Sequence, residues 1–91
     1  MIKMRNKYQK AYSKYLNKKG IEWQYEPKAF TVGKEKYTPD FYLSETDTYV
    51  IIKGYWREDL KKRIELFQKQ YFSMNIVVLE PSELKKLRII K

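Results

Sequence analysis

Asp40 and Lys53 are the two residues of this sequence whose types and spacing best suit phosphate chemistry. They lie in residues 37–43 and 48–53, two runs rich in Tyr, Phe, Thr, Val and Ile, as strands are, with a polar turn between them. Folded as an antiparallel hairpin, the runs place Asp40 opposite the neighbourhood of Ile52. The spacing therefore predicts that the Asp40 and Lys53 side chains face one cavity, where a metal ion and a phosphate can be held.

The residue types that are missing narrow the possible chemistry. The 91-residue chain contains no cysteine, which excludes a disulfide framework, a thiolate zinc site and a cysteine nucleophile. It also contains no histidine, which excludes a histidine general base. Hydrolysis by this chain would have to use carboxylates, lysine and metal-bound water.

The order of residues around the hairpin resembles a known signature. Pro39-Asp40, a spacer and a strand that ends in Ile51-Ile52-Lys53-Gly54 are similar to the motif of the PD-(D/E)XK nucleases. The following Tyr55-Trp56 and the upstream segment WQYEP at residues 23–27 resemble small phage-type endonucleases of that superfamily. The resemblance covers nearly the whole chain. It implies metal-dependent hydrolysis of DNA, with Asp40 as a ligand of Mg²⁺ or Mn²⁺ and Lys53 as the catalytic lysine that positions or activates the water.

Two positions depart from this signature. Ile51 stands where the family has its second metal-binding acid, and Gln9 stands where the first helix of the family often supplies another acid. A lone Asp40 beside a lysine favours an ion pair over a tight magnesium site, so we expect cleavage to be impaired or lost. Glu26 and Glu65 are the acidic residues that remain open as substitute ligands.

Hydrophobic periodicity predicts the elements that position these residues. Apolar residues at helical spacing indicate a helix over residues 2–18, whose apolar face contains Tyr8, Ala11, Tyr12, Tyr15 and Leu16. Alternating residues and turn signals predict strands over residues 20–25, 29–32, 37–43 and 48–53, followed by a helix over residues 58–72. The apolar run at residues 75–79 is typical of a strand buried on both faces, and a last helix with Leu84 and Leu87 inward begins at Pro81.

We expect an α/β (α+β) fold whose core has the order α-β-β-β-α-β-α. We expect one domain over residues 1–91, with a mixed sheet of about four strands flanked by helices. The resemblance implies the same arrangement, a restriction-endonuclease-like core.

The charge balance points to a polyanionic partner. Twenty basic residues against eleven acidic ones give a net charge of +9, which suits DNA. The candidate contacts to nucleic acid include two groups of cations, Lys7, Lys10 and Lys14 on the first helix and Lys61, Lys62 and Arg63 on the second. An aromatic pair, Tyr55 and Trp56, either stacks on an unpaired base or packs under the second helix. No apolar run is long enough to span a membrane and no signal peptide is evident, so an intracellular protein, of phage type by resemblance, is expected.

Three functions remain open at this level. The first is a metal-dependent DNA endonuclease with an altered acidic cluster, and the second is a nuclease fold that binds DNA without cutting it. The third is a small RNA-binding or protein-interaction module. Assembly into a homodimer that would cut both strands is also open.

Overall fold

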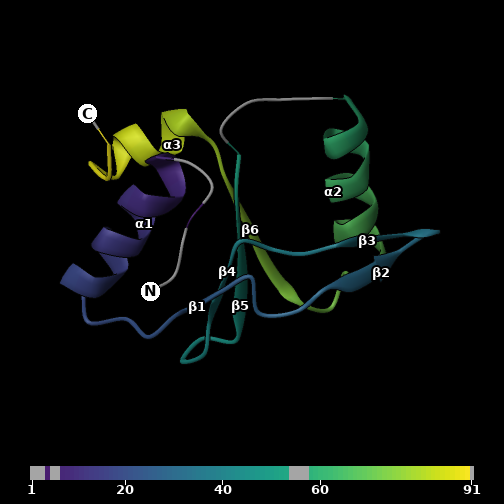
Figure 1. Cartoon of the computed structure of the whole chain (residues 1–91), viewed down its shortest axis with the longest axis horizontal. Coiled ribbons are helices and arrows are strands. Elements are labelled where there is room, and N and C mark those ends of the chain that lie inside the picture. The colour runs from purple at the N-terminus through teal and green to yellow at the C-terminus, as the bar shows by residue number, and fades with distance from the viewer. Residues whose placement is uncertain (1–3, 5–6, 54–57, 91) are drawn as a thin grey trace.

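The computed structural model describes residue 4, residues 7–53 and residues 58–90 (Figure 1). Its main sheet has four strands in the order β1 (Gln24–Tyr25), β4 (Phe41–Leu43), β5 (Thr48–Ile52) and β6 (Asn75–Leu79). The β1–β4 and β4–β5 pairs are antiparallel, whereas β6 runs parallel to β5. A parallel neighbour needs a crossover connection, and α2 (Glu58–Gln70) supplies it.

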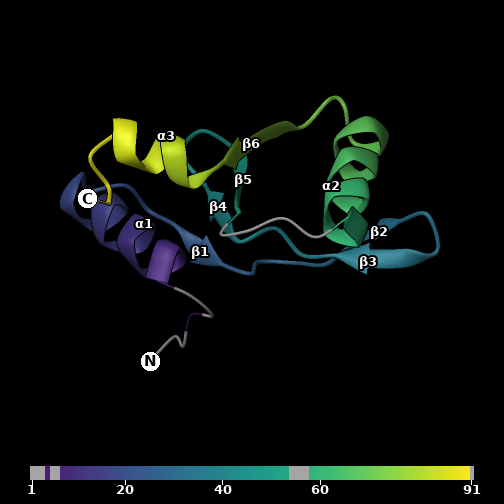
Figure 2. The same ribbon diagram turned by 90° about the horizontal axis from the view of Figure 1, so that it is seen from above.

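Helices cover the sheet from two sides. α1 (Lys7–Lys18) and α3 (Pro81–Lys86) lie next to each other on one side. The other side carries α2 and a separate hairpin of β2 (Phe30–Val32) and β3 (Glu35–Tyr37), as Figure 2 shows from above. Read through the main sheet, the element order is α-β-β-β-α-β-α, and the predicted α+β fold with a mixed four-stranded sheet is confirmed.

The alternation of side chains along β5 divides the core in two. Val50 and Ile52 point to the α1 side, where they pack with Leu16 and Phe41. Ile51 points to the α2 side. There it joins a second buried cluster that comprises Phe30, Val32, Tyr37, Ile64 and Phe67.

The predicted strand over residues 37–43 is divided in the structure. Tyr37 ends β3 in the small hairpin, Phe41 begins β4 in the main sheet, and a bend lies between them at Asp40. Pro39 is fully buried at this division. A proline has no backbone N–H to donate to a strand partner, so the chain leaves one sheet here and enters the other.

The predicted face of α1 is confirmed at Tyr12 and Leu16, which are buried, and at Tyr8 and Tyr15, which pack against their cluster, but it omits two buried polar residues. The buried residues are Gln9, Tyr12, Ser13 and Leu16, while Ala11 and Tyr15 are only half-buried. The polar members of this face are satisfied within the protein; the Ser13 hydroxyl, for example, donates to the Lys10 carbonyl at 2.7 Å. Met4 is not helical, so the helix predicted from residue 2 is described from Lys7 onward.

Two predicted burials at the C-terminal end are also wrong. β6 is an edge strand rather than a central one, and Val77 is 41% exposed. Leu87 lies just beyond α3 and is 50% exposed, while Leu84 is buried as expected. The predicted second helix ends at Gln70 instead of residue 72.

Burial of Tyr12 predicts a loss of stability in alkali. Its burial, with a smaller effect of nearby Tyr15, raises the pKa of Tyr12 from 10.0 to about 12. Above pH 10 the unfolded chain gives up this proton before the folded chain does, so the free energy of unfolding falls as the pH rises towards 12. The contribution is fully present below pH 10. We expect Tyr12→Phe to make the denaturant midpoint less dependent on alkaline pH than in the unmodified chain, and equal slopes would contradict this.

Candidate active site

The Asp40 carboxylate is held from two elements at once. Its Oδ2 atom accepts a hydrogen bond from the backbone N–H of Ile52 at 2.7 Å. Its Oδ1 atom accepts a short hydrogen bond from the side-chain amide of Gln9 on α1. The Asp40 carbonyl in turn accepts from the backbone N–H of Glu26 at 2.9 Å. Each carboxylate oxygen therefore has an N–H donor, and the bend after Pro39 is fixed to both α1 and β5.

Gln9 is the buried link between α1 and the hairpin. Its side chain is 2% exposed, and its Oε1 atom accepts a hydrogen bond from the Tyr25 hydroxyl at 2.9 Å. The amide thus donates to Asp40 through nitrogen and accepts from Tyr25 through oxygen, which satisfies both ends of the group. Because the amide nitrogen of Gln9 faces Asp40, this side chain presents no oxygen ligand to a metal ion beside Asp40.

Lys53 is buried beside the end of β6. Its backbone N–H donates to the Leu79 carbonyl at 2.9 Å, and its side chain is 6% exposed. The ammonium group pairs with the Glu80 carboxylate at 3.1 Å. No motif in the sequence marks Glu80, although the parallel register that pairs Ile52 with Leu79 makes it the neighbour of Lys53. That register is the signal from which the pair can be predicted.

Asp40 contacts the end of β5, directly before Lys53. The Asp40 carboxylate binds the amide of Ile52, which immediately precedes Lys53. The register also continues as predicted, because Phe41 pairs with Val50. A shared cavity that faces both side chains stays a prediction.

Ile51 has an apolar environment. Its side chain is 1% exposed and belongs to the buried cluster on the α2 side, together with Phe30 and Phe67. The buried members of this cluster are aromatic and aliphatic, and Tyr37 is the one that carries a polar group. Isoleucine is therefore well matched to its surroundings.

The candidate substitute acids lie at different distances from this centre. The Glu26 backbone is bonded to Asp40, and Glu26 has a positive φ of 46°, so the turn that contains it is next to the bend. Glu65 is exposed on the outer face of α2, where it lines a surface hollow with Leu66 and Phe72. Across residues 7–53 and 58–90, no group of three or more acidic side chains is placed to hold a metal ion.

The donor set does not fit a magnesium site. Magnesium needs oxygen ligands in near-octahedral geometry, usually one or two carboxylates with waters and a phosphate. Here both oxygens of Asp40 already accept N–H hydrogen bonds. The two positions for which the resemblance implies further carboxylates hold an apolar core residue, Ile51, and an amide, Gln9.

The predicted nucleic-acid contacts fall into three groups. Lys7, Lys10 and Lys14 are exposed along α1. Lys61 and Lys62 are exposed on α2, whereas Arg63 forms an ion pair with Glu35 of β3 at 2.7 Å. Tyr55 and Trp56 lie outside the described residues. No helix in the described part of the chain is long and apolar enough to cross a membrane.

Comparison with known proteins connects this arrangement to a phage enzyme. No protein-family model matches the chain. Among curated proteins, it is 34% identical to Endonuclease I of Escherichia phage T7 over 79 residues, which cover 82% of this chain and 52% of the relative. The chain thus spans about half the length of the relative that it matches. Over most of its own length, this chain is similar to a phage endonuclease.

Proposed function

We propose that this chain is a DNA-binding domain of PD-(D/E)XK endonuclease type in which metal-dependent cleavage is impaired. Residues 1–91 would form one nuclease-like domain of an intracellular, phage-type protein. The similarity to Endonuclease I and the α+β fold support the parent activity, which is hydrolysis of DNA phosphodiester bonds with Mg²⁺ or Mn²⁺. Assembly as a homodimer stays a prediction, and sedimentation of the purified chain tests it.

One observation carries the proposal of impaired cleavage. Each oxygen of Asp40 already accepts one N–H hydrogen bond, and the two neighbouring positions of the resemblance, Ile51 and Gln9, supply no further carboxylate. A metal-activated water needs ligands that lower its pKa and hold it in line with the phosphate. With Ile51 and Gln9 in place of acids, a bound ion would be held chiefly by Asp40, whose two oxygens each already share their charge with an N–H donor.

DNA binding without cleavage needs only the cationic surface. Exposed lysines on α1 and α2, with a net charge of +9, provide phosphate contacts that require no metal. A protein-interaction module is the alternative function. It predicts a partner that binds equally well at low and high salt, which separates it from an electrostatic DNA-binding mode.

We expect the chain to bind DNA with a strong dependence on salt and with little sequence preference. The slope of log affinity against log salt should steepen by roughly 0.9 for each phosphate that is neutralised. Fluorescence anisotropy of a labelled duplex over a series of salt concentrations measures that slope. The variant Lys61→Ala/Lys62→Ala should flatten it, while Lys34→Ala on the small hairpin serves as the control.

A slope near zero would rule out this electrostatic mode. The cleavage arm uses supercoiled plasmid with magnesium or manganese, and we expect little nicking by the unmodified chain. Metal-dependent nicking that Asp40→Ala abolishes would show that another carboxylate completes the site.

A further inference from the structure

A basic groove lies between α1 and the chain that follows α3. One hollow of about 670 Å³ is lined along α1 by Lys10, Lys14 and Tyr15, and on the other side by Leu87 and Arg88. A second hollow of about 550 Å³ adjoins it, and Lys7, Ala11 and Ile89 line both. We refer to the two hollows together as the α1 groove. It lies on the side of α1 away from the buried Gln9.

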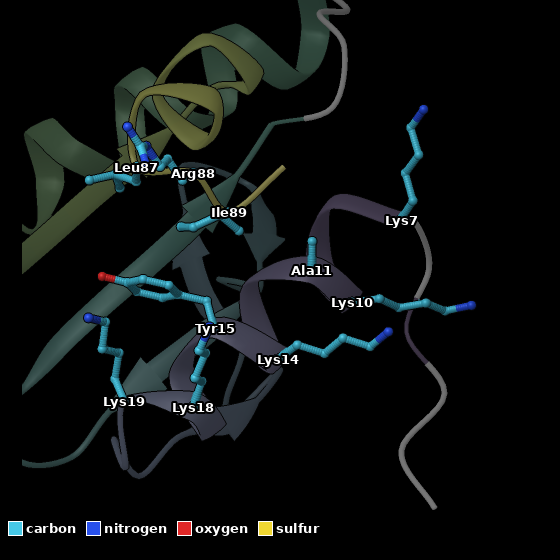
Figure 3. Close-up of a pocket in the computed structure, with 10 residues that line it drawn as sticks. All are labelled: Lys7, Lys10, Ala11, Lys14, Tyr15, Lys18, Lys19, Leu87, Arg88 and Ile89. Carbon is cyan, nitrogen blue, oxygen red and sulfur yellow. The ribbon is translucent and has the colours of Figure 1, made fainter. Parts of the chain in front are cut away.

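The lysines of the α1 groove form a row. Lys7, Lys10, Lys14 and Lys18 follow one another at three- and four-residue spacing, which places them on one side of the helix. Successive members are separated by about 4.5–6 Å along the helix axis, since an α-helix rises 1.5 Å per residue. Figure 3 shows Lys10 and Lys14 extending in the same direction from α1, while Lys7 points upward from the start of the helix. None of the described residues that line the two hollows is acidic.

Apolar and aromatic groups lie beside this row. Leu87 is 50% exposed, and Ile89 lies between it and α1 in the close-up (Figure 3). The Tyr15 ring is half-buried and stacks on Tyr12 at a centroid distance of 6.1 Å, which restricts its orientation. The occupant that uses this groove fully must therefore carry both closely spaced negative charges and flat apolar faces.

Arg88 occupies a strained backbone position at the edge of the groove. Its φ of 59° lies in the left-handed region, which glycine adopts without strain and other residues adopt at a cost. The turn is a regular helix end, in which Arg88 N–H bonds the Lys85 carbonyl and Ile89 N–H bonds the Leu84 carbonyl. Glycine is the preferred residue at this point of such a turn. An arginine here places a guanidinium group at the edge of the groove.

We propose that the α1 groove binds a single-stranded segment of nucleic acid. Its phosphates lie along the lysine row and Arg88, and an unpaired base lies against Tyr15 and Leu87. This inference rests on the proposed DNA-binding function and adds the form of the strand that this surface prefers. Single strands expose the faces of their bases, and a cationic groove with aromatic side chains is how proteins bind them. A duplex keeps those faces stacked inside and would use only the lysines.

The first test compares two probes and two matched variants. The probes are a short labelled oligothymidylate and a duplex of the same length, and both are titrated by anisotropy at several salt concentrations. Lys10→Glu/Lys14→Glu changes the groove, and Lys34→Glu/Lys36→Glu makes the same charge change on the small hairpin at the other end of the molecule (Figure 1). We expect the groove variant to weaken oligothymidylate binding by at least tenfold more than the hairpin variant. Its salt slope should decrease by roughly 0.7 for each phosphate that is no longer neutralised.

The second test separates binding from folding. Arg88→Gly should raise the melting temperature by a few degrees because it relieves the left-handed strain, and it should weaken oligothymidylate binding. Arg88→Lys keeps the charge and the strain, so both quantities should stay close to those of the unmodified chain. Tyr15→Leu should weaken the single strand about tenfold and leave the duplex unchanged, while Tyr15→Phe keeps both affinities. Opposite changes in stability and affinity at Arg88 cannot arise from a loss of fold.

The outcomes distinguish this proposal from the general one. If the duplex binds but the groove and hairpin variants weaken the oligothymidylate equally, the α1 groove is not a site and the DNA-binding function stands. If the duplex binds as tightly as the oligothymidylate and Tyr15→Leu changes neither, the preference for a single strand is wrong. An acidic polypeptide that competes as well as the oligothymidylate would overturn nucleic acid as the occupant. Failure of both probes to bind would remove the proposed function itself.

Discussion

Replacement of Ile51 by glutamate should lower the free energy of unfolding by roughly 3 kcal/mol or more at neutral pH. The side chain at this position is 1% exposed and lies among Phe30, Phe67 and other apolar groups, so the new carboxylate would lose its hydration without a partner. Small domains have about 5–15 kcal/mol of stability, which makes this loss a large part of the whole. Urea denaturation of the metal-free protein measures it.

Matched variants and the pH dependence separate the loss of stability caused by the buried charge from the loss caused by the changed shape of the side chain. Ile51→Val should cost about 1 kcal/mol, and Ile51→Gln should fall between valine and glutamate. Burial raises the pKa of a carboxyl group, so the folded variant would take up a proton more readily than the unfolded chain. The loss of stability should therefore be smallest below the ordinary glutamate pKa of about 4.3 and should grow as the pH rises. A loss that is independent of pH would contradict the burial of the charge.

The same substitution tests the proposed metal-dependent cleavage. Manganese or magnesium should restore part of the stability of Ile51→Glu, because an ion that binds only the folded state stabilises it by mass action. Adding Gln9→Glu supplies the acid from α1 and removes an amide that now binds Asp40. We expect plasmid cleavage by the double variant to exceed that of the unmodified chain. Cleavage that stays at the background level, with no metal-dependent shift in melting temperature, would argue against an impaired nuclease site.

Replacement of Asp40 by alanine should also change the free energy of unfolding strongly. The direction of that change distinguishes two descriptions of the site. In a cluster of acids that share a metal site, removing one carboxylate relieves repulsion and stabilises the metal-free protein. Here the Asp40 carboxylate accepts hydrogen bonds from the Gln9 amide and the Ile52 N–H, and its removal leaves both donors without this acceptor. We expect a loss of about 2–4 kcal/mol, since each buried donor left unsatisfied costs roughly 1–3 kcal/mol.

A double-mutant cycle assigns that loss to the hydrogen bond. Gln9→Leu removes the amide, and the cycle with Asp40→Ala should give a coupling energy of roughly 1–2 kcal/mol, as for other contacting residues. The pair Tyr42→Phe and Asp47→Ala serves as an exposed control, because the Tyr42 hydroxyl donates to Asp47 at 2.8 Å on the surface. If Asp40→Ala raises the melting temperature, then Asp40 repels another acid and our description of the site is wrong.

The sequence predicted most elements from local signals, but only Gln24–Tyr25 of the strand predicted over residues 20–25 is a strand, and the strand predicted over residues 37–43 is divided. The β-branched and aromatic residues at 48–52 indicate a strand, and helical spacing near Ile64 and Phe67 identifies a core face without knowledge of the partner. The register of the β4–β5 hairpin also follows from its short turn. These features depend on residues that lie close together in the chain.

The errors concern contacts between distant parts of the chain. Gln9 is buried because it binds Asp40, 31 residues away, and its polarity alone predicts exposure. The pairing of Lys53 with Glu80 depends on the parallel register across α2. The exposure of Val77 follows from the edge position of β6, which an apolar run cannot reveal.

The parallel pairing of β5 with β6 also affects how the chain is made. β4 and β5 are joined by a short turn, so this hairpin can form as soon as residue 52 leaves the ribosome. β6 is synthesised only after α2, and until then the Val50-Ile51-Ile52 edge of β5 has no strand beside it. An open apolar edge can pair with other chains. The exposed edge therefore lasts until the whole crossover through α2 has been synthesised and β6 can pair with β5.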